Sequence, residues 1–408
     1  MHHFDLPTFL GVLIAIIAAA KLFGALAQWV GQPAVLGELV AGVFLGGSVL
    51  NIVDPTVEIL HLLAELGVII LLFAIGLETD LKKLLKVGGA SLAVAVAGVV
   101  LPFALGYAAC LALGLSSLVA VVAGATLTAT SVGITARVLH DLNQLHSTES
   151  QVILGAAVID DVIGLIILAA VAGIAKGESL SALAIFKIAS TAVGFLAATL
   201  LLGRVIVPAL ARRLAKFDLP GTATMLALLL ALGLAWLANY AGSATIIGAF
   251  AAGLLVRETP QSHEIERGIT QLGHFFVPLF FVIVGAAVDV AVFNPLQAAN
   301  HQTLAIGGLL ILAAIVGKFA AGYAPFWMTG DKRIIGAGMI PRGEVGLIFA
   351  QMGLSSGVFD GAMFSAVTLM VMVTTFVAPP LLKALCPRGS VARVDEELDA
   401  IEDLVTEA

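Results

Sequence analysis

The chain has 408 residues, of which 60% are hydrophobic and only 12% are charged, and its formal net charge is −7. Soluble domains carry roughly 45–50% apolar and about 25% charged residues, so this composition excludes an ordinary soluble protein and indicates a membrane protein. The negative net charge also argues against binding to nucleic acid, which requires a basic surface. Cys110 and Cys386 are the only cysteines, and because the topology below puts them near opposite membrane faces, we expect no disulfide between them.

Apolar stretches recur along the whole chain, and about 20 such residues suffice to cross a hydrocarbon core of about 30 Å. The first stretch lacks a basic leader and a cleavage site, so we expect it to be retained as a span. The predicted fold class is therefore an all-α polytopic membrane protein of about thirteen transmembrane helices. In chain order the predicted spans are 8–24, 33–50, 58–78, 87–114, 117–139, 149–175, 181–211, 220–240, 243–256, 265–289, 302–328, 333–355 and 360–385.

Basic residues lie mostly on one side of this predicted bundle. The outer loops keep essentially Lys176 and Lys187. The positive-inside rule therefore predicts the N-terminus outside and the C-terminus in the cytoplasm, in the inner (plasma) membrane. The last 22 residues, 387–408, form an acidic tail that we expect to be solvated. The basic residues of the predicted cytoplasmic loops are Lys82, Lys83, Lys86, Arg137, Arg212, Arg213, Lys216, Arg257, Arg267, Lys332, Arg333, Lys383, Arg388 and Arg393.

Segments in the first half of the chain resemble segments in the second half. The pairs are VLGELVAGVFL (35–45) with IIGAFAAGLLV (246–256), FAIGLETDL (73–81) with VIVGAAVDV (282–290), and TSVGI (130–134) with GEVGL (343–347). All three offsets lie between 209 and 213 residues, which is hard to obtain by chance. Because seven spans separate the equivalents, the sequence predicts two six-helix repeats of inverted topology, an architecture of many secondary transporters.

Two spans contain residues that favour an interrupted helix. The fifth carries TLTATSVGIT, in which Thr128, Thr130 and Ser131 compete for backbone hydrogen bonds. Its equivalent, MIPRGEVGLI, contains a proline that removes a donor. We predict crossed discontinuous helices here, with Arg342 and Glu344 offsetting the partial charges of the helix ends. The alternative is that the hydroxyls pack against neighbouring helices and that PRGE forms a surface turn.

Ionisable residues inside apolar spans are candidates for function, because a charge at the bilayer centre costs about 2.5–3.5 kcal/mol on insertion scales. Asp160 and Asp161 lie in the middle of the sixth span, and Lys318 lies about mid-span in the eleventh. Adjacent helical residues point about 100° apart, so we expect Asp160 to pair with Lys318 while Asp161 faces a cavity. A static ion pair that only holds the bundle together is the alternative. For Lys21, Glu38, Glu65 and Arg204 we favour snorkelling or structural ion pairs.

A carboxylate buried beside another carboxylate favours its protonated form, yet its oxygens also suit a small hard cation. Asp161 could bind Na⁺ or Li⁺ together with Thr130, Ser131 and unwound carbonyls, and protonation would remove its best ligand. Proton and cation would then exclude one another, which amounts to exchange at a site that opens to one side at a time. Lys318 is a possible second proton carrier, which would make the exchange electrogenic.

The motifs TATSVGITARVL, VIDDVIGLIIL and GMIPRGEVGLIFA, with the lysine of the eleventh span, resemble the monovalent cation:proton antiporter superfamily. The nearest branch is the bacterial one that contains Na⁺/H⁺ antiporters and Kef-type potassium-efflux systems. The resemblance implies a homodimer of thirteen-span subunits, each with a scaffold and a mobile core that moves like an elevator. It also implies that Asp161 binds the ion, that Asp160 is its partner, and that Lys318 pairs with it; the double aspartate is typical of electrogenic members.

This resemblance implies a domain division and a substrate. The predicted units are a scaffold or dimer domain (1–80 and 217–292), a core domain (81–178 and 293–386), a linker helix (179–216) and the tail (387–408). Kef-type proteins carry a nucleotide-binding domain after the last span, for which 22 residues are too few. Exchange of Na⁺ or Li⁺ for H⁺ is therefore the leading hypothesis, and K⁺/H⁺ exchange is the alternative.

Other classes of protein fit less well. A channel would need a filter of stacked carbonyls or a charged ring, and the sequence contains no such motif. An intramembrane aspartyl protease would need carboxylates on different helices, so no enzyme is predicted. Organic-anion symport on a related fold remains an alternative. We expect no cofactor beyond the transported ions, and lipid and a second copy of the chain as partners.

Overall fold

The computed structural model describes residues 5–175, 182–214, 221–242, 244–288, 290, 294, 296 and 300–386. Within these residues all regular secondary structure is helical, which confirms the predicted all-α class. The predicted acidic tail (387–408) and the two ends of the predicted linker (179–216) lie outside the described residues, as do Lys176 and the Glu344 side chain.

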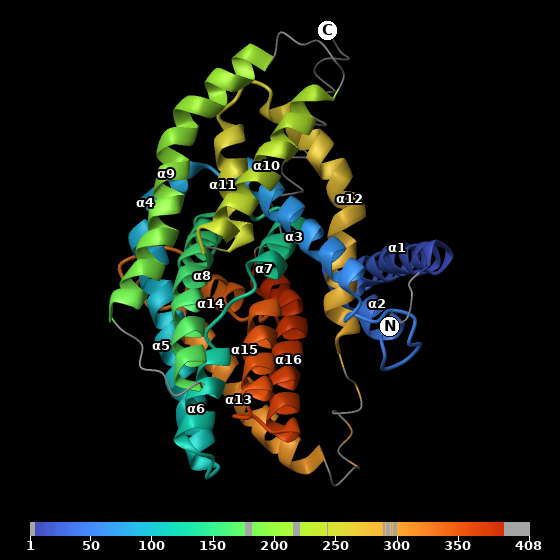
Figure 1. Ribbon diagram of the computed structural model, residues 1–408, viewed down its shortest axis with the longest axis vertical. Helices are drawn as coiled ribbons and strands as arrows, with labels where there is room; N and C mark the ends of the chain where they lie inside the picture. Colours follow the sequence, from blue (N-terminus) through green and yellow to red (C-terminus); the bar gives the residue numbers. More distant parts are fainter. Residues whose placement is uncertain are drawn as a thin grey trace, which may run out of the picture.

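The first half of the chain forms nine helices within the described residues (Figure 1). Capping side chains help to define where helices begin. At the start of α6, the Ser116 side chain accepts a hydrogen bond from the Val119 amide. The helices are α1 (Leu6–Trp29), α2 (Ala34–Leu45), α3 (Glu58–Glu78), α4 (Leu81–Lys86), α5 (Gly88–Ala112), α6 (Ser117–Thr126), α7 (Val132–Asp141), α8 (Thr148–Ala175) and α9 (Ala182–Leu214).

Seven further helices follow in the second half of the described chain. Asp331 and Asp360 cap two of them, since their carboxylates accept backbone hydrogen bonds from the first turn. The helices are α10 (Thr222–Tyr240), α11 (Thr245–Arg257), α12 (Ser262–Ala286), α13 (His301–Ala321), α14 (Lys332–Gly338), α15 (Glu344–Ser355) and α16 (Gly361–Leu385).

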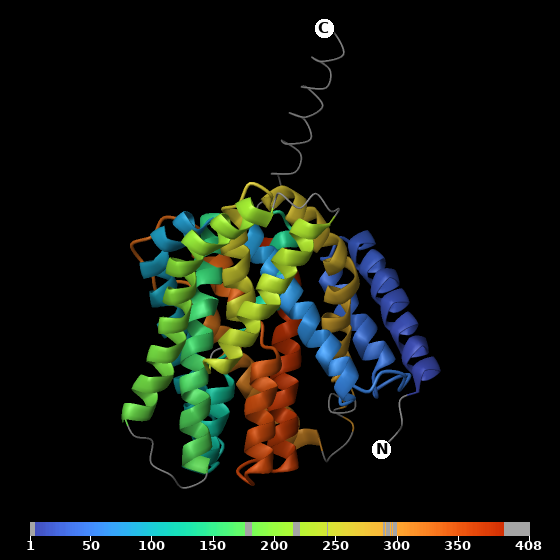
Figure 2. The same cartoon turned by 45° about the horizontal axis from the view of Figure 1, so that its top comes forward.

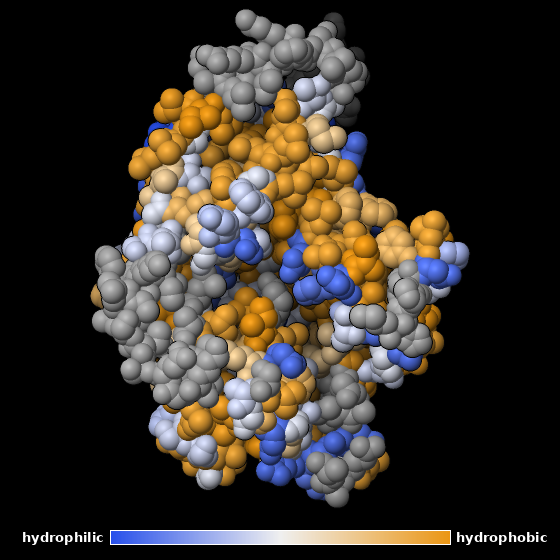
Figure 3. Space-filling view, in the orientation of Figure 1, coloured by the Kyte–Doolittle hydropathy of each residue, from blue (hydrophilic) through white to orange (hydrophobic). Residues whose placement is uncertain are grey.

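The surface of the molecule matches a hydrocarbon environment. Among the described helices, eight are long and apolar enough to cross a membrane, and several shorter apolar helices accompany them. Large apolar side chains such as Leu22, Leu201 and Trp236 are exposed, and apolar side chains dominate the face in Figure 3. The chain is therefore a multi-pass membrane protein.

Both predicted helix interruptions are present. The fifth predicted span divides into α6 and α7, with residues 127–131 between them, and the twelfth divides into α14 and α15, with residues 339–343 between them. The surface-turn alternative for PRGE is wrong, because Arg342 is completely buried. The fold thus contains two pairs of half-helices rather than two continuous spans.

Two predicted boundaries are wrong in an informative way. The eleventh span was expected to reach residue 328, but α13 ends at Ala321, because Gly322 packs against the backbone of Gly336 and the chain then turns. Lys318 therefore lies in the last turn of its helix and not at mid-span. The second span was expected to reach residue 50, but α2 ends at Leu45, and a loop follows in which Asn51 has a φ of 52°.

The helices form two groups that lie side by side (Figure 1). In one group α3 packs against α11 and α12, and α2 packs against α1 and α12. In the other group α5 packs against α6, α8 and α13, and α13 packs against α16. We call these the α3 group (α1–α3 with α10–α12) and the α5 group (α5–α8 with α13–α16). The long helix α9 contacts both α8 and α11, one helix of each group.

The two ends of the bundle differ (Figure 2). One face, which we call the basic face because Lys82, Lys83 and Lys86 of α4 lie there, also carries the loops at 142–147 and 322–331. The opposite face, which we call the N-terminal face because α1 begins there, carries the loops at 46–57 and 356–360.

Glycines bring the helices of the α3 group into backbone contact. A Cβ atom at Gly42 of α2 would collide with the Val282 carbonyl of α12 and would lie 2.7 Å from the Gly285 Cα. The contact between α11 and α3 repeats this arrangement, since a Cβ atom at Gly253 would lie 2.7 Å from Gly76. Small residues are what allow membrane helices to approach this closely.

We predict that Gly253→Ala lowers the stability of the protein, because the added methyl group has no space between α11 and α3. Overpacking of this kind costs about 1–3 kcal/mol. Thermal unfolding in detergent should therefore show a lower midpoint for Gly253→Ala. Gly233→Ala in α10 is the matched control, because nothing lies within 4 Å of the added atom; equal midpoints for the two variants would contradict the packing argument.

Candidate functional site

The two interrupted helices meet at their breaks and satisfy each other's backbone. The Ser131 amide donates a hydrogen bond to the Pro341 carbonyl oxygen, over 2.8 Å. The Thr130 and Thr135 hydroxyls donate to the carbonyl oxygens of Met339 (3.4 Å) and Gly338 (2.6 Å), at the end of α14. Unwound backbone at membrane depth requires such internal partners, and the chain supplies them from the other interruption. We call this region the crossover.

Arg342 ties the second interruption to the first. Its guanidinium Nη1 donates to the Ala129 carbonyl oxygen, and its own carbonyl oxygen accepts from the Thr375 hydroxyl of α16. The side chain is fully buried. Because Ala129 follows the carbonyl end of α6, the positive charge lies where the helix dipole is negative. Arg342 therefore lies where the sequence predicted it, at the crossover.

Asp160 and Lys318 form a buried ion pair. The Lys318 ammonium donates to Asp160 Oδ2 over 3.1 Å, and the two side chains are 0% and 1% exposed. Asp160 Oδ1 is also buried and has no hydrogen-bond partner among the described residues. The charges of Asp161 and Arg342 also act on the Lys318 ammonium. The pair expected from the sequence is thus present, while its part in transport stays a prediction.

A glycine makes the space that the ammonium group occupies. A Cβ atom at Gly98 in α5 would lie 3.3 Å from Lys318 Nζ, and one at Gly317 would press on the backbone of Pro102. Close contact between α5 and α13 therefore leads the lysine side chain along α5 to the aspartate on α8. Neither glycine stands out in the sequence as part of a site.

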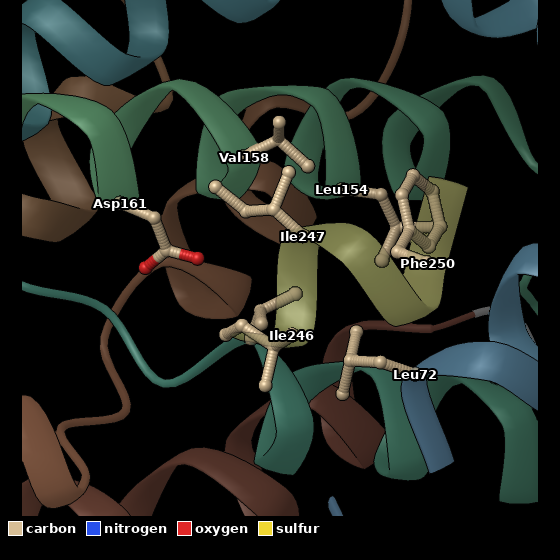
Figure 4. A pocket seen from close by; sticks show the side chains of 8 residues that line it. Leu72, Leu154, Val158, Asp161, Ile246, Ile247 and Phe250 are labelled. Carbon is tan, nitrogen blue, oxygen red and sulfur yellow. The ribbon is translucent and has the colours of Figure 1, made fainter. Parts of the chain in front are cut away.

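Asp161 faces a different environment from its neighbour. It is half-buried and lines a small void of about 10 Å³ at the start of α7, next to Val132. The other lining residues are apolar, and Figure 4 shows the Asp161 carboxylate projecting from α8 on the side that faces Ile246 and Ile247 of α11. Asp161 therefore lies where the α5 group meets the α3 group.

The hydroxyl residues predicted to support the ion site all lie in the first helix interruption, but not all of their hydroxyls donate across the crossover. Thr130 and Ser131, both 5% exposed, lie in the first interruption directly before Val132, which shares the void with Asp161. Thr128 lies in the same interruption, but its hydroxyl donates to Ala125 of α6 over 2.8 Å and not across the crossover. Gly343 packs against Ser131, since a Cβ atom there would lie 2.7 Å from the Ser131 Oγ.

A cavity of about 650 Å³ separates the two helix groups on the N-terminal face. Its rim includes Pro55 and Phe364, and its deep end includes Gly343 and Thr375 of the crossover region. Ile246 lines both this cavity and the void beside Asp161. An apolar side chain thus stands between the cavity and the carboxylate.

A cluster of charges joins the two groups near the basic face, and sequence reasoning missed it. Arg137 of α7 lies 3.0 Å from Asp141 and 3.8 Å from Glu38 of α2, and His140 lies 3.3 Å from Glu78 of α3. In the sequence, Arg137 counts only as one of the positive charges of the predicted cytoplasmic loops. The one sequence feature that pointed to the cluster is Glu38, for which a structural ion pair was among the expectations. Glu38 is 4% exposed, and its ion-pair partner is Arg137.

The remaining ionisable residues of the predicted spans fall into two kinds. Lys21 and Arg204 are exposed on the outside of the bundle, in agreement with snorkelling. Glu65 lies 3.4 Å from His61, one turn away on α3, and both line the cavity.

Comparison of the sequence with known proteins identifies the family to which the chain belongs. Residues 12–387 match the family described as "Sodium/hydrogen exchanger, transmembrane". The chain belongs to the sodium/hydrogen exchanger family. The exchanger is 41% identical to the high-affinity Na⁺/H⁺ antiporter NhaS3 of Synechocystis sp., over 92% of this chain and 90% of the relative.

Two further likenesses agree with this family. The exchanger is 37% identical to the Na⁺/H⁺-K⁺ antiporter GerN of Bacillus cereus, over 90% of this chain and 94% of the relative. Its fold is similar to that of the sodium proton antiporter MjNhaP1 from Methanocaldococcus jannaschii at pH 8, with a TM-score of 0.65 and 16% identity, over 92% of this chain and 96% of that one. The family predicted from the motifs is therefore confirmed.

We predict that the buried ion pair of the exchanger is more sensitive to the loss of one partner than to the loss of both. Removing one charge of such a pair costs about 3–5 kcal/mol, whereas replacing both by apolar residues is often neutral. Lys318→Met should therefore lower the thermal midpoint in detergent much more than Lys318→Met combined with Asp160→Leu. Additive losses in this double-mutant cycle would contradict the pairing.

His140 of the exchanger should make the contact between α7 and α3 depend on pH. It lies just beyond the predicted span (117–139), and hydrogen bonds with Asp141 and Glu78 raise its pKa to about 9. The ordinary histidine pKa is about 6.5, so its stabilising contribution is complete below about pH 6.5 and is lost as the pH rises through about 9. The difference in thermal midpoint between wild type and His140→Gln should be largest near pH 6 and vanish near pH 10; a constant difference would contradict this.

Proposed function

We propose that the chain exchanges Na⁺ or Li⁺ for H⁺ across the membrane, with Asp161 as the group that binds either ion. One observation carries this proposal: two adjacent carboxylates have different surroundings. Asp160 is held in a buried ion pair, whereas Asp161 lines a void where the two helix groups meet. The position of Asp161 at the boundary between the two helix groups, outside the Asp160–Lys318 ion pair, supports a part in transport.

The chemistry of exchange follows from the ligands near Asp161. Na⁺ and Li⁺ are hard cations that prefer oxygen ligands. The carboxylate would supply the negative charge, and the Thr130 and Ser131 hydroxyls, next to the start of α7, would supply further oxygens together with water. Protonation of Asp161 neutralises its charge and blocks one oxygen. The cation and the proton would therefore compete for one site.

Lys318 would provide a second proton. If cation binding at Asp161 draws Asp160 away from Lys318, the ammonium loses its partner in a buried position and releases a proton, because burial disfavours an unpaired charge. Two protons would then move for each cation, and the exchange would be electrogenic. The contact of Lys318 Nζ with Asp160 Oδ2 supports this route.

An elevator movement of the α5 group against the α3 group would provide alternating access. The cavity on the N-terminal face and the charge cluster near the basic face both lie between the two groups. The arrangement supports the proposed division into a scaffold (1–80 and 217–292), a core (81–178 and 293–386), a linker (179–216) and a tail (387–408). In this proposal the basic face lies in the cytoplasm and the N-terminus lies outside, in the inner membrane; the positive-inside rule supports this orientation.

The inverted repeat and the homodimer are part of the same proposal. The predicted repeat aligns Gly42 with Gly253, and Gly76 with Gly285. The contact between Gly42 and Gly285 therefore has an equivalent in the other half, which is the contact between Gly253 and Gly76. This symmetry supports two inverted halves. For the dimer, the exposed apolar side chains of α1 and α10 offer a surface that a second copy could cover.

K⁺ in place of Na⁺ is the second candidate. The Bacillus cereus relative is a Na⁺/H⁺-K⁺ antiporter by name, so K⁺ stands there beside Na⁺ and H⁺. Proteoliposomes with an internal pH-sensitive dye and an imposed pH gradient distinguish the two when Li⁺, Na⁺ and K⁺ are added in turn. We expect dequenching with Na⁺ and Li⁺.

We predict that Asp161→Asn abolishes the Na⁺-induced collapse of the pH gradient in such proteoliposomes, because an amide neither binds a proton nor supplies a negative ligand. Val158→Leu, one turn away on α8 and lining the same void, is a control for packing. A variant with an unaltered thermal midpoint and full activity would disprove the role of Asp161.

For Lys318→Gln we predict a change in the number of protons moved per cation and in the response to membrane potential. A potassium gradient with valinomycin sets the potential, and the rate of Na⁺-driven proton movement is measured against it. A residual rate with unchanged voltage dependence would contradict the second proton carrier, while the role of Asp161 would stand.

A further inference from the structure

The cavity on the N-terminal face has only two ionisable residues among its described lining residues, and they lie together. His61 and Glu65 occupy successive turns of α3, and their side chains are 60% and 59% exposed. The rest of the lining is apolar or neutral, including Phe280 of α12 and Leu347 and Ile348 of α15. The transport mechanism above does not use this pair.

The spacing of the two side chains suits chelation. His61 Nε2 and Glu65 Oε1 lie 3.4 Å apart. Zinc binds histidine nitrogen and carboxylate oxygen at about 2.0–2.2 Å in tetrahedral geometry, which puts neighbouring ligand atoms about 3.4 Å apart. Both ligands are one turn apart on the same face of a helix, so binding would require no rearrangement of the backbone. The pair therefore already has the separation that a metal ion requires.

We propose that His61 and Glu65 form a binding site for a divalent transition-metal ion of the zinc class at the mouth of the cavity, and that the bound ion inhibits transport. Among the described residues, no group of three or more His, Cys, Asp or Glu side chains is arranged so that it could hold a metal ion, so this site has two protein ligands. Water would complete the coordination, so the site is reversible rather than structural.

Inhibition follows from the position of the pair. α3 belongs to one helix group and α15 to the other, and both line the cavity. A hydrated divalent ion there would stand between two groups that must move past each other, and its charge would repel an arriving monovalent cation. This consequence rests on the proposed function, whereas metal binding itself does not.

The first experiment measures binding without transport. Isothermal titration calorimetry with ZnCl₂ is run on the full chain in detergent at about pH 8, above the ordinary histidine pKa of about 6.5. His2 and His3 are replaced by glutamine in every sample, because adjacent histidines also bind zinc. Loss of a single outer-shell partner lowers metal affinity about 10–100-fold, so loss of a ligand in His61→Gln or Glu65→Gln should weaken binding at least tenfold.

The matched control is a second histidine–glutamate pair. His263 and Glu266 near the start of α12 lie 3.6 Å apart, on the other end of the bundle. His263→Gln should leave the site at His61 intact. Equal zinc affinity in wild type and His61→Gln, or a loss in His263→Gln alone, would overturn the proposed site.

The second experiment measures inhibition. Proteoliposomes receive ZnCl₂ on both sides, and each variant's exchange rate is normalised to its own rate without zinc. We expect His61→Gln to raise the zinc concentration for half-inhibition at least as much as it weakens binding. Binding without inhibition would overturn the blocking role. If a variant lacks exchange activity, calorimetry still decides the site, so failure of the metal site and failure of the proposed function remain distinguishable.

Discussion

Backbone polar groups at membrane depth must find partners inside the protein, and this constraint shapes the centre of the molecule. Two helices break there, and each break satisfies the other through the Ser131 amide, the Thr130 and Thr135 hydroxyls and the Arg342 guanidinium. Neither break would be stable alone, because water does not reach buried backbone at this depth. The crossover is therefore a single cooperative unit made from two distant parts of the chain.

The crossover creates a polar centre in which charged side chains can be buried. Asp160, Lys318 and Arg342 are almost fully inaccessible, yet each lies close to an opposite charge or to a helix end. Burial of opposite charges is rarely the most stable solution for a bundle. Their presence is better explained by a task that requires charge at this place, which agrees with a family of ion exchangers.

The sequence predicted much of this centre because its local chemistry is unusual. Hydroxyls and glycine within TLTATSVGIT, and proline within MIPRGEVGLI, marked both interruptions, and the adjacent aspartates stood out in an apolar helix. Interactions between distant helices were harder to predict. Lys318 was found, but its helix is shorter than its apolar composition suggests, because Gly322 packs against α14. Arg137 looked like an ordinary loop charge, since only the folded chain brings it to Glu38.

The packing of Gly98 against the end of the lysine side chain links two positions that are 220 residues apart in the chain. A Cβ atom at position 98 would lie 3.3 Å from the Lys318 ammonium nitrogen, and a larger side chain there would compete with the ammonium group for space. The length of the residue at one position is thus limited by the size of the residue at the other. If the lysine were moved to a different helix, for instance in a designed transporter, the helix beside it would also need a small residue that leaves room for the ammonium group.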